Sequence, residues 1–166
     1  ERAKAVRENY RALKAEGLYG IEDDSLKKII NILSSNTNLD TDKLGIGSTI
    51  FAVKPGDGSA REQAASCQKV LGGWANLARE YATKRYRSNL INWGMIPFRI
   101  EGVLSFSEGD YIYIKDIRTK ISDGDDEIEA YVVNASGMKR IVLLLDALTD
   151  EERQIILDGC LINYYR

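Results

Sequence analysis

Apolar residues recur at helical spacing along the first part of the chain. Residues 1–16 are mostly strong helix formers, and Val6, Tyr10 and Leu13 fall on one face of the predicted helix. Gly17 is a typical helix stop. Because this apolar stripe is narrow, the pattern predicts a helix that lies on the surface or against a partner.

A second helix and a strand follow in the pattern. Leu26–Leu33 carries apolar residues at helical spacing, and Asp24 or Ser25 is a suitable N-cap for it. Residues 34–42 are polar and rich in Asn, Thr and Asp, so they predict a loop. Ser48–Val53 is rich in β-branched and aromatic residues and predicts a buried strand.

The middle of the chain alternates between turn signals and short regular segments. Pro55–Gly58 predicts a sharp turn, with Ser59 as the N-cap of a helix over Arg61–Gln68. Trp74–Asn89 has helical propensity throughout. Phe98–Ile100 is predicted to be a short extended piece.

The last third of the chain is dominated by strand patterns. Thr149–Glu152 has the spacing of a capping box and predicts a C-terminal helix. The fold class is therefore α/β, in one domain with a mixed sheet and flanking helices. Three runs of β-branched and aromatic residues predict the strands, namely Tyr111–Ile114, Ile128–Val133 and Arg140–Leu145.

The composition limits the classes of protein and the kinds of site that this chain can form. The chain has 166 residues, of which 44% are hydrophobic, so it is long enough for one domain with a real core. The net charge of −2 argues against a dedicated nucleic-acid binder. The absence of histidine removes the commonest general base and the commonest metal ligand. No apolar run is long enough to span a membrane, and Cys67 and Cys160 alone cannot hold an iron–sulfur cluster. With no signal peptide, so few cysteines are typical of a cytoplasmic protein.

The segment that carries candidate chemistry is Gly56–Gln63. Its glycines allow a tight turn into a helix whose first N–H groups favour an anion. Arg61 adds a guanidinium suited to a carboxylate or phosphate, and Ser59 adds a hydroxyl at the same place. The segment matches neither a P-loop nor a dinucleotide fingerprint. From the local pattern alone, a purely structural turn into a helix is the preferred explanation.

Four motifs in register indicate a family. They are Gly56-Asp-Gly-Ser-Ala-Arg-Glu-Gln-Ala-Ala65, Leu71-Gly-Gly73, Asn89-Leu90 and Gly94-Met-Ile-Pro97. Their order and spacing over Gly56–Phe98 resemble the C-terminal swivelling domain of the aconitase and isopropylmalate isomerase superfamily. The variant is most similar to the bacterial aconitase-like hydratases. This resemblance implies a swivelling β/β/α domain, with residues 1–45 as a helical extension or linker and 46–166 as the core.

The resemblance also implies roles for single residues. It places Ser59 as the alkoxide base that moves a proton next to a carboxylate, and Arg61 as a substrate-carboxylate binder. Ala60 and Gln63 depart from the family pattern, which has Ser and His there. Arg7 is a faint match to a second substrate arginine.

The reaction implied is reversible dehydration of a hydroxy di- or tricarboxylate, aided by a [4Fe-4S] cluster. The family's cluster ligands are cysteines on other domains, so this chain by itself is expected to be inactive and to work with those domains. The family also places a strand near Trp74–Arg79, followed by a helix to about Trp93, against the local helical propensity.

Three assemblies remain open. Because the chain begins at Glu1 rather than Met, we expect a fragment of a longer enzyme. The first alternative is the small subunit of a heteromeric isopropylmalate isomerase-type enzyme. The second is a non-catalytic module that binds carboxylates or a partner protein. A basic and aromatic patch between Arg79 and Arg87 is best explained as a solvated helix face.

Overall fold

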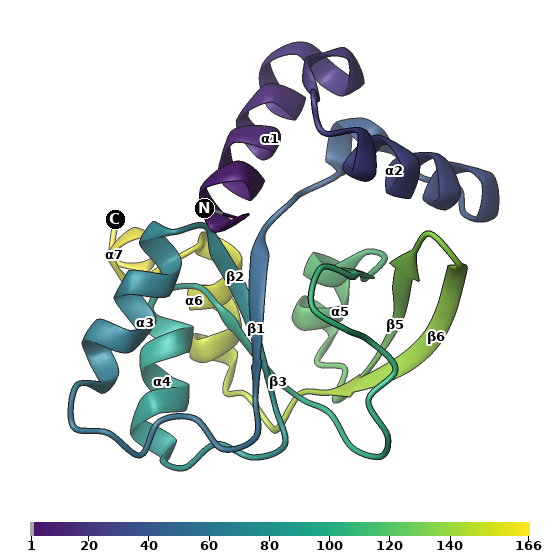
Figure 1. Ribbon diagram of the computed structural model, residues 1–166. Helices are drawn as coiled ribbons and strands as arrows, with labels where there is room; N and C mark the ends of the chain where they lie inside the picture. The colour runs from purple at the N-terminus through teal and green to yellow at the C-terminus, as the bar shows by residue number, and fades with distance from the viewer. Residues whose placement is uncertain (1) are drawn as a thin grey trace.

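The computed structural model describes residues 2–166, so the first predicted helical position, Glu1, lies outside the described residues. Within this range, six strands form a single mixed sheet in the order β1-β2-β3-β6-β5-β4 (Figure 1). The strands are β1 (Ser48–Ala52), β2 (Gly73–Ala78), β3 (Ile96–Arg99), β4 (Tyr111–Tyr113), β5 (Glu127–Asn134) and β6 (Gly137–Leu144).

The sheet consists of two halves with different pairing. β1, β2 and β3 run parallel, whereas β4, β5 and β6 are antiparallel neighbours. The halves meet where Arg99 of β3 pairs with Leu144 of β6. The mixed sheet and its flanking helices confirm the predicted α/β class.

Helices cover the sheet in separate groups. In Figure 1, α3, α4 and α6 gather beside β1–β3, α5 lies beside β5, and α1 and α2 extend from the amino end of β1. The α-helices are α1 (Arg2–Glu16), α2 (Asp24–Asn36), α3 (Arg61–Val70), α4 (Lys84–Asn92), α5 (Ile117–Asp123), α6 (Asp150–Asp158) and α7 (Leu161–Tyr164). Two 3₁₀ turns, Gly17–Gly20 and Thr41–Lys43, flank α2.

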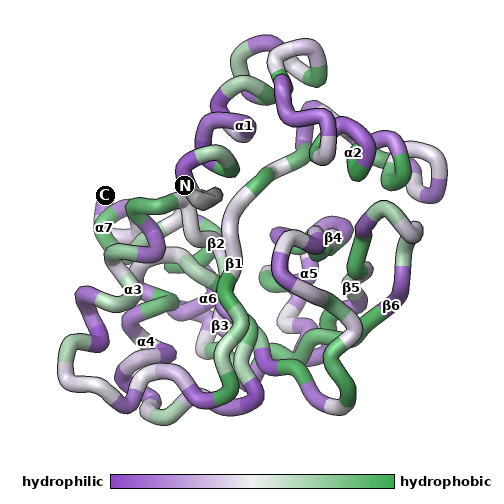
Figure 2. The backbone as a smooth tube through the Cα atoms, viewed as in Figure 1, coloured by the Kyte–Doolittle hydropathy of each residue, from purple (hydrophilic) through white to green (hydrophobic). Residues whose placement is uncertain are grey.

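One apolar core joins the two halves of the sheet. Phe98 of β3 and Leu143 of β6 are almost fully buried in the same cluster, together with Ile155 of α6. Figure 2 shows the strands as largely hydrophobic through the middle of the molecule, whereas α2 is mainly hydrophilic. Burial of this shared surface stabilises both halves together.

The N-terminal helices have a smaller core of their own. Leu13 of α1 packs with Leu26 and Ile30 of α2, and Ile29 and Leu33 on α2 face Val133 of β5. Both predicted helices are therefore confirmed.

Several local predictions are wrong by a residue or more. The cap of α2 is Asp23, whose carboxylate accepts from the backbone N–H groups of Ser25 and Leu26, so neither Asp24 nor Ser25 fills that role. The strand at Ser48–Val53 forms, but as an edge strand rather than a buried one, with Ile50 42% exposed.

Three other segments differ from local expectation. The helical propensity of Trp74–Asn89 is overridden between Gly73 and Ala78, which form β2, as the family resemblance implied. Helix α5 was not predicted; it ends where Gly124 takes a left-handed conformation. Helix α7 was not predicted as a separate helix either, because Gly159 ends α6 before it.

Candidate functional site

The candidate site is the loop between β1 and α3, residues 53–60. It leaves the carboxyl end of β1, an edge at which parallel sheets commonly bind ligands. Backbone contacts hold it to the segment after β2: the Val53 carbonyl accepts from the N–H groups of Arg79 and Glu80, and the Pro55 carbonyl accepts from Ala82 at 2.9 Å. The loop is therefore fixed on one side and open on the other.

Gly56 fixes the position of this loop. Its φ of +97° lies in the region that favours glycine, and a Cβ there would collide with the side chain of Tyr86. Its carbonyl accepts from Arg61 Nε and from Thr83 Oγ1, both at 3.0 Å. Gly58, by contrast, has open space around its Cα.

Arg61, the predicted carboxylate binder, is oriented by the loop itself. Its Nε donates to the Gly56 carbonyl at 3.0 Å, and its Nη2 donates to the Asp57 carbonyl at 3.4 Å. Within the described part of the chain, Nη1 donates to no acceptor. The guanidinium is half-buried and held in one orientation, with an edge left for an oxyanion.

Ser59 lies two residues before Arg61 along the chain but does not cap the helix as predicted. The N-cap is Ala60, which has no side-chain capping bond, and α3 begins one residue later. Ser59 is exposed, and its hydroxyl has no hydrogen-bond partner among residues 2–166. The serine is thus free at the start of a helix whose first turn has no side-chain cap and favours negative charge.

A buried polar group of side chains lies beneath the loop. The Tyr86 ring packs under Gly56, and its hydroxyl accepts from Asn76 Nδ2 at 3.0 Å and from Gln68 Nε2 at 3.3 Å. Asn76 on β2 is 1% exposed. This support could not be predicted from sequence patterns, because the three residues come from three different elements.

Helices α3 and α4 are joined next to the site. Trp93 Nε1 donates to the Glu62 carboxylate at 2.6 Å. In the amide orientation that satisfies both of its atoms, Asn89 accepts from the Glu62 N–H at 3.0 Å. The Asn89-Leu90 motif therefore contacts the first turn of α3.

Arg7 is not brought to this loop. Its Nη1 donates to the Val70 carbonyl at 2.7 Å, at the carboxyl end of α3, whereas Arg61 opens the same helix. The ten residues of α3 separate these ends by about 15 Å at 1.5 Å rise per residue. Arg7, with Tyr10 packed edge-on against Trp74, holds α1 to the opposite edge of the domain.

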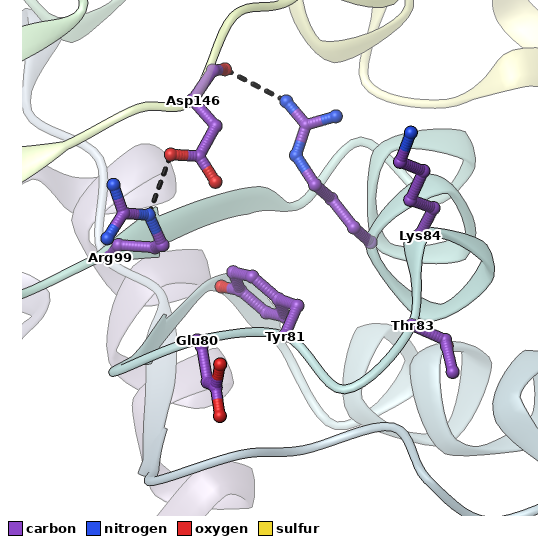
Figure 3. A pocket seen from close by; sticks show the side chains of 7 residues that line it. Glu80, Tyr81, Thr83, Lys84, Arg99 and Asp146 are labelled. Atoms are coloured by element: carbon purple, nitrogen blue, oxygen red, sulfur yellow. Dashed lines mark hydrogen bonds and ion pairs between the residues drawn. The ribbon is translucent and has the colours of Figure 1, made fainter.

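An open cavity of about 370 Å³ lies where the segment after β2 leads into α4 (Figure 3). The Tyr81 hydroxyl in its wall donates to the Phe98 carbonyl at 2.9 Å, and burial, the main cause, raises its pKa above the ordinary value. In the sequence, the one signal that could have identified residues such as Tyr81 was their position directly after a parallel strand. Those that line the cavity include Glu80, Tyr81, Lys84, Arg87, Arg99 and Asp146.

The described residues do not form a metal centre. Residues 2–166 contain no group of three or more Cys, Asp or Glu side chains placed to hold a metal ion. Cys67 is exposed on α3 and Cys160 is half-buried before α7, and both are free thiols. Among the helices described, none is both long and apolar enough to cross a membrane.

Comparison with known proteins places the loop inside a recognised domain. A family model of the aconitase C-terminal domain matches residues 9–102. The homoaconitase small subunit of Thermus thermophilus is 32% identical over 126 residues. That alignment covers 70% of this chain and 63% of the relative, so the chain spans less than two thirds of the relative's length. The family match contains the loop, α3, α4 and all three parallel strands.

Proposed function

Because the chain belongs to the aconitase C-terminal domain family, we propose that it is the swivelling domain of an aconitase-like hydro-lyase. Its substrate would be a hydroxy di- or tricarboxylate that is reversibly dehydrated. One observation carries the proposal: the loop exposes a Ser59 hydroxyl two residues before an oriented Arg61, at an α3 N-terminus without a side-chain cap.

In this proposal Ser59 is the base. A serine hydroxyl is a poor base in water, so its alkoxide needs fixed positive potential nearby. The first N–H groups of α3 and the Arg61 guanidinium supply that potential on this chain. Closure against other domains would exclude water and strengthen it. Ser59 would take the proton from the carbon next to a substrate carboxylate and return it in the reverse reaction.

Arg61 would bind that carboxylate. Two of its donors are already fixed by loop carbonyls, so little side-chain entropy is lost when Nη1 meets an oxyanion. Ala60 supplies no hydroxyl at a position where the family pattern has serine, so contacts to the substrate would differ there.

The [4Fe-4S] cluster of such enzymes does not fit the residues of this chain. The two cysteines lie on separate elements, and the described residues offer no third ligand near either one. The cluster would therefore belong to other domains, and the part of this chain is confined to the base and the carboxylate site.

A second candidate assembly is a small subunit that pairs with a separate large subunit. It is supported by the similarity to the homoaconitase small subunit. The same loop would then close over the site from a separate chain. In a third alternative the chain is a non-catalytic module, in which Arg61 binds a carboxylate and Ser59 has no role.

The test is turnover by the complete enzyme, with its cluster reconstituted without oxygen, on a panel of hydroxy-carboxylates. We expect Ser59→Ala to lower kcat at least about 100-fold with little change in substrate affinity. Ser66→Ala is the matched control, since Ser66 lies on α3 and only donates to the Gln63 carbonyl. Undiminished turnover in Ser59→Ala would overturn the role of this serine. Carboxylate binding that Arg61→Ala abolishes, without turnover on any substrate, would favour the non-catalytic module.

A further inference from the structure

The Gly56 carbonyl is the point at which the candidate loop is joined to the start of helix α4. It accepts one hydrogen bond from Arg61 Nε and another from Thr83 Oγ1, each at 3.0 Å. Arg61 opens the helix that follows the loop, whereas Thr83 lies 27 residues after Gly56 and directly before α4. The oxygen atom that holds the guanidinium is therefore itself held from outside the loop.

The Thr83 hydroxyl has a fixed orientation. Its oxygen accepts from the Tyr86 N–H at 3.2 Å, as the N-cap of α4. A hydroxyl has one proton to donate, and here the Gly56 carbonyl receives it. In Figure 3, the Thr83 side chain points away from Lys84. Thr83 is thus directed at the loop, and both its donor and its acceptor are used.

An anchor outside the loop is needed to orient Arg61 relative to the rest of the domain. The bonds from Arg61 to the Gly56 and Asp57 carbonyls close within one short segment, so they fix the guanidinium only against the loop. Backbone bonds to the segment after β2 hold the first part of the loop, before Gly56. Among residues 2–166, Thr83 makes the one side-chain hydrogen bond that reaches a loop carbonyl from beyond α3.

We propose that Thr83 is a positioning residue for Arg61, acting through the Gly56 carbonyl. This role rests on the proposed function and deepens it, by assigning what sets the affinity of the carboxylate site. With the carbonyl held, the guanidinium is ordered before a carboxylate arrives, so binding does not have to immobilise it. Thr83 itself contacts neither the carboxylate nor the reacting carbon.

Three variants separate this role from the capping of α4. Thr83→Val keeps the branched shape but removes both the donor to Gly56 and the cap. Thr83→Ser restores both, since serine is an equally good N-cap. Thr149→Val is the matched control: Thr149 caps α6 in the same way, by accepting from the Glu152 N–H, and its side chain makes no bond to the loop in the described structure.

The first measurement is the exchange with water of the Arg61 Nε–H group, followed by NMR in the 166-residue protein. We expect about fivefold faster exchange in Thr83→Val, since one hydrogen bond to the shared carbonyl is lost. Thr83→Ser and Thr149→Val should match the wild type. Wild-type exchange in Thr83→Val would overturn the positioning role. An equal change in Thr149→Val would also overturn it, because loss of a helix cap would then be a sufficient cause.

The second measurement is KM in the complete enzyme, with the hydroxy-carboxylate that it turns over fastest. Thr83→Val should raise KM about 3- to 10-fold, the cost of ordering one long side chain on binding, and leave kcat within about twofold. Thr83→Ser should keep the wild-type KM. In an Arg61→Lys background, Thr83→Val should have no further effect, because the Nε–H through which it acts is gone.

The same rise in KM in both backgrounds would show that Thr83 acts independently of Arg61 and would overturn the proposal. The proposed function fails separately. If the complete enzyme turns over none of the hydroxy-carboxylates while Thr83→Val still speeds exchange at Arg61, the positioning of Arg61 stands without that reaction.

Discussion

The two halves of the sheet differ in where their polar side chains lie. In the parallel half, Asn76 is the one polar residue among those described that is fully buried, and it donates to the Tyr86 hydroxyl below the loop. In the antiparallel half, the interior positions of β5 are apolar, and the Glu129–Arg140 pair lies outside. Buried polar groups are costly unless they are paired, so their presence marks where the structure is specialised.

The difference follows from how the strands are connected. Two successive parallel strands must be joined by a crossover, so the carboxyl ends of β1 and β2 open into loops that lead to helices. The β5–β6 hairpin needs only a tight turn and leaves no such loop. The family match ends at residue 102, just after β3, so it covers the half with the crossovers. The antiparallel half contributes Ile128 and Leu143 to the shared core.

The largest contrast between the halves is expected at two glycines with the same backbone angle. Gly56 in the parallel half and Gly109 before β4 both have a φ of +97°. Alanine at Gly109 meets open space, so it should cost only the conformational strain, about 1–2 kcal/mol. Alanine at Gly56 adds a collision with Tyr86, for a total of about 2–5 kcal/mol.

Urea unfolding of both variants measures this difference. The site should also respond differently, since Gly56→Ala moves the carbonyl that orients Arg61. Equal losses of stability in the two variants would show that Tyr86 does not support the loop.

A smaller contrast is expected for one substitution made in each half. Tyr86→Phe keeps the ring under Gly56 but leaves the amide donors of Asn76 and Gln68 without their acceptor. We expect a loss of about 1–3 kcal/mol in the free energy of unfolding. Tyr131→Phe removes a hydroxyl that donates to Glu129 on the surface, and stability should not change measurably. Thermal unfolding of both variants checks this, and similar effects would contradict the contrast.

The same contrast explains which parts could be predicted from the sequence. The capping box at Thr149–Glu152 formed as predicted because all its partners are local. The segment Gly73–Ala78 did not follow its helical propensity, because pairing with β1 and β3 buries Leu77 and Ala78. Helix α5 was not predicted, and its start is irregular: the N-cap Asp116 has a left-handed φ of 51° and makes no side-chain capping bond.

The candidate site was predictable only in part. The loop carries Ser59 and Arg61 within one short motif, so spacing was enough to single them out. Its support and the cavity are assembled from residues far apart in the chain, such as Arg99 and Asp146. Only the fold brings such residues together.

The smallest effect at neutral pH, and the one most specific to the parallel half, concerns Tyr81. Burial, with nearby Tyr86 adding to it, raises the pKa of the Tyr81 hydroxyl above its ordinary value of 10.0. The folded state thus favours the neutral phenol, so its contribution to stability is complete below about pH 10 and is lost above it, where the unfolded chain ionises first.

We therefore expect Tyr81→Phe to cost about 1 kcal/mol at about pH 8, through the lost bond to the Phe98 carbonyl. Between about pH 10 and pH 11 the free energy of unfolding of the wild type should fall toward that of the variant. Urea unfolding at these two extremes, about pH 8 and about pH 11, measures both, and a gap between the two proteins that stays constant would show that Tyr81 ionises normally.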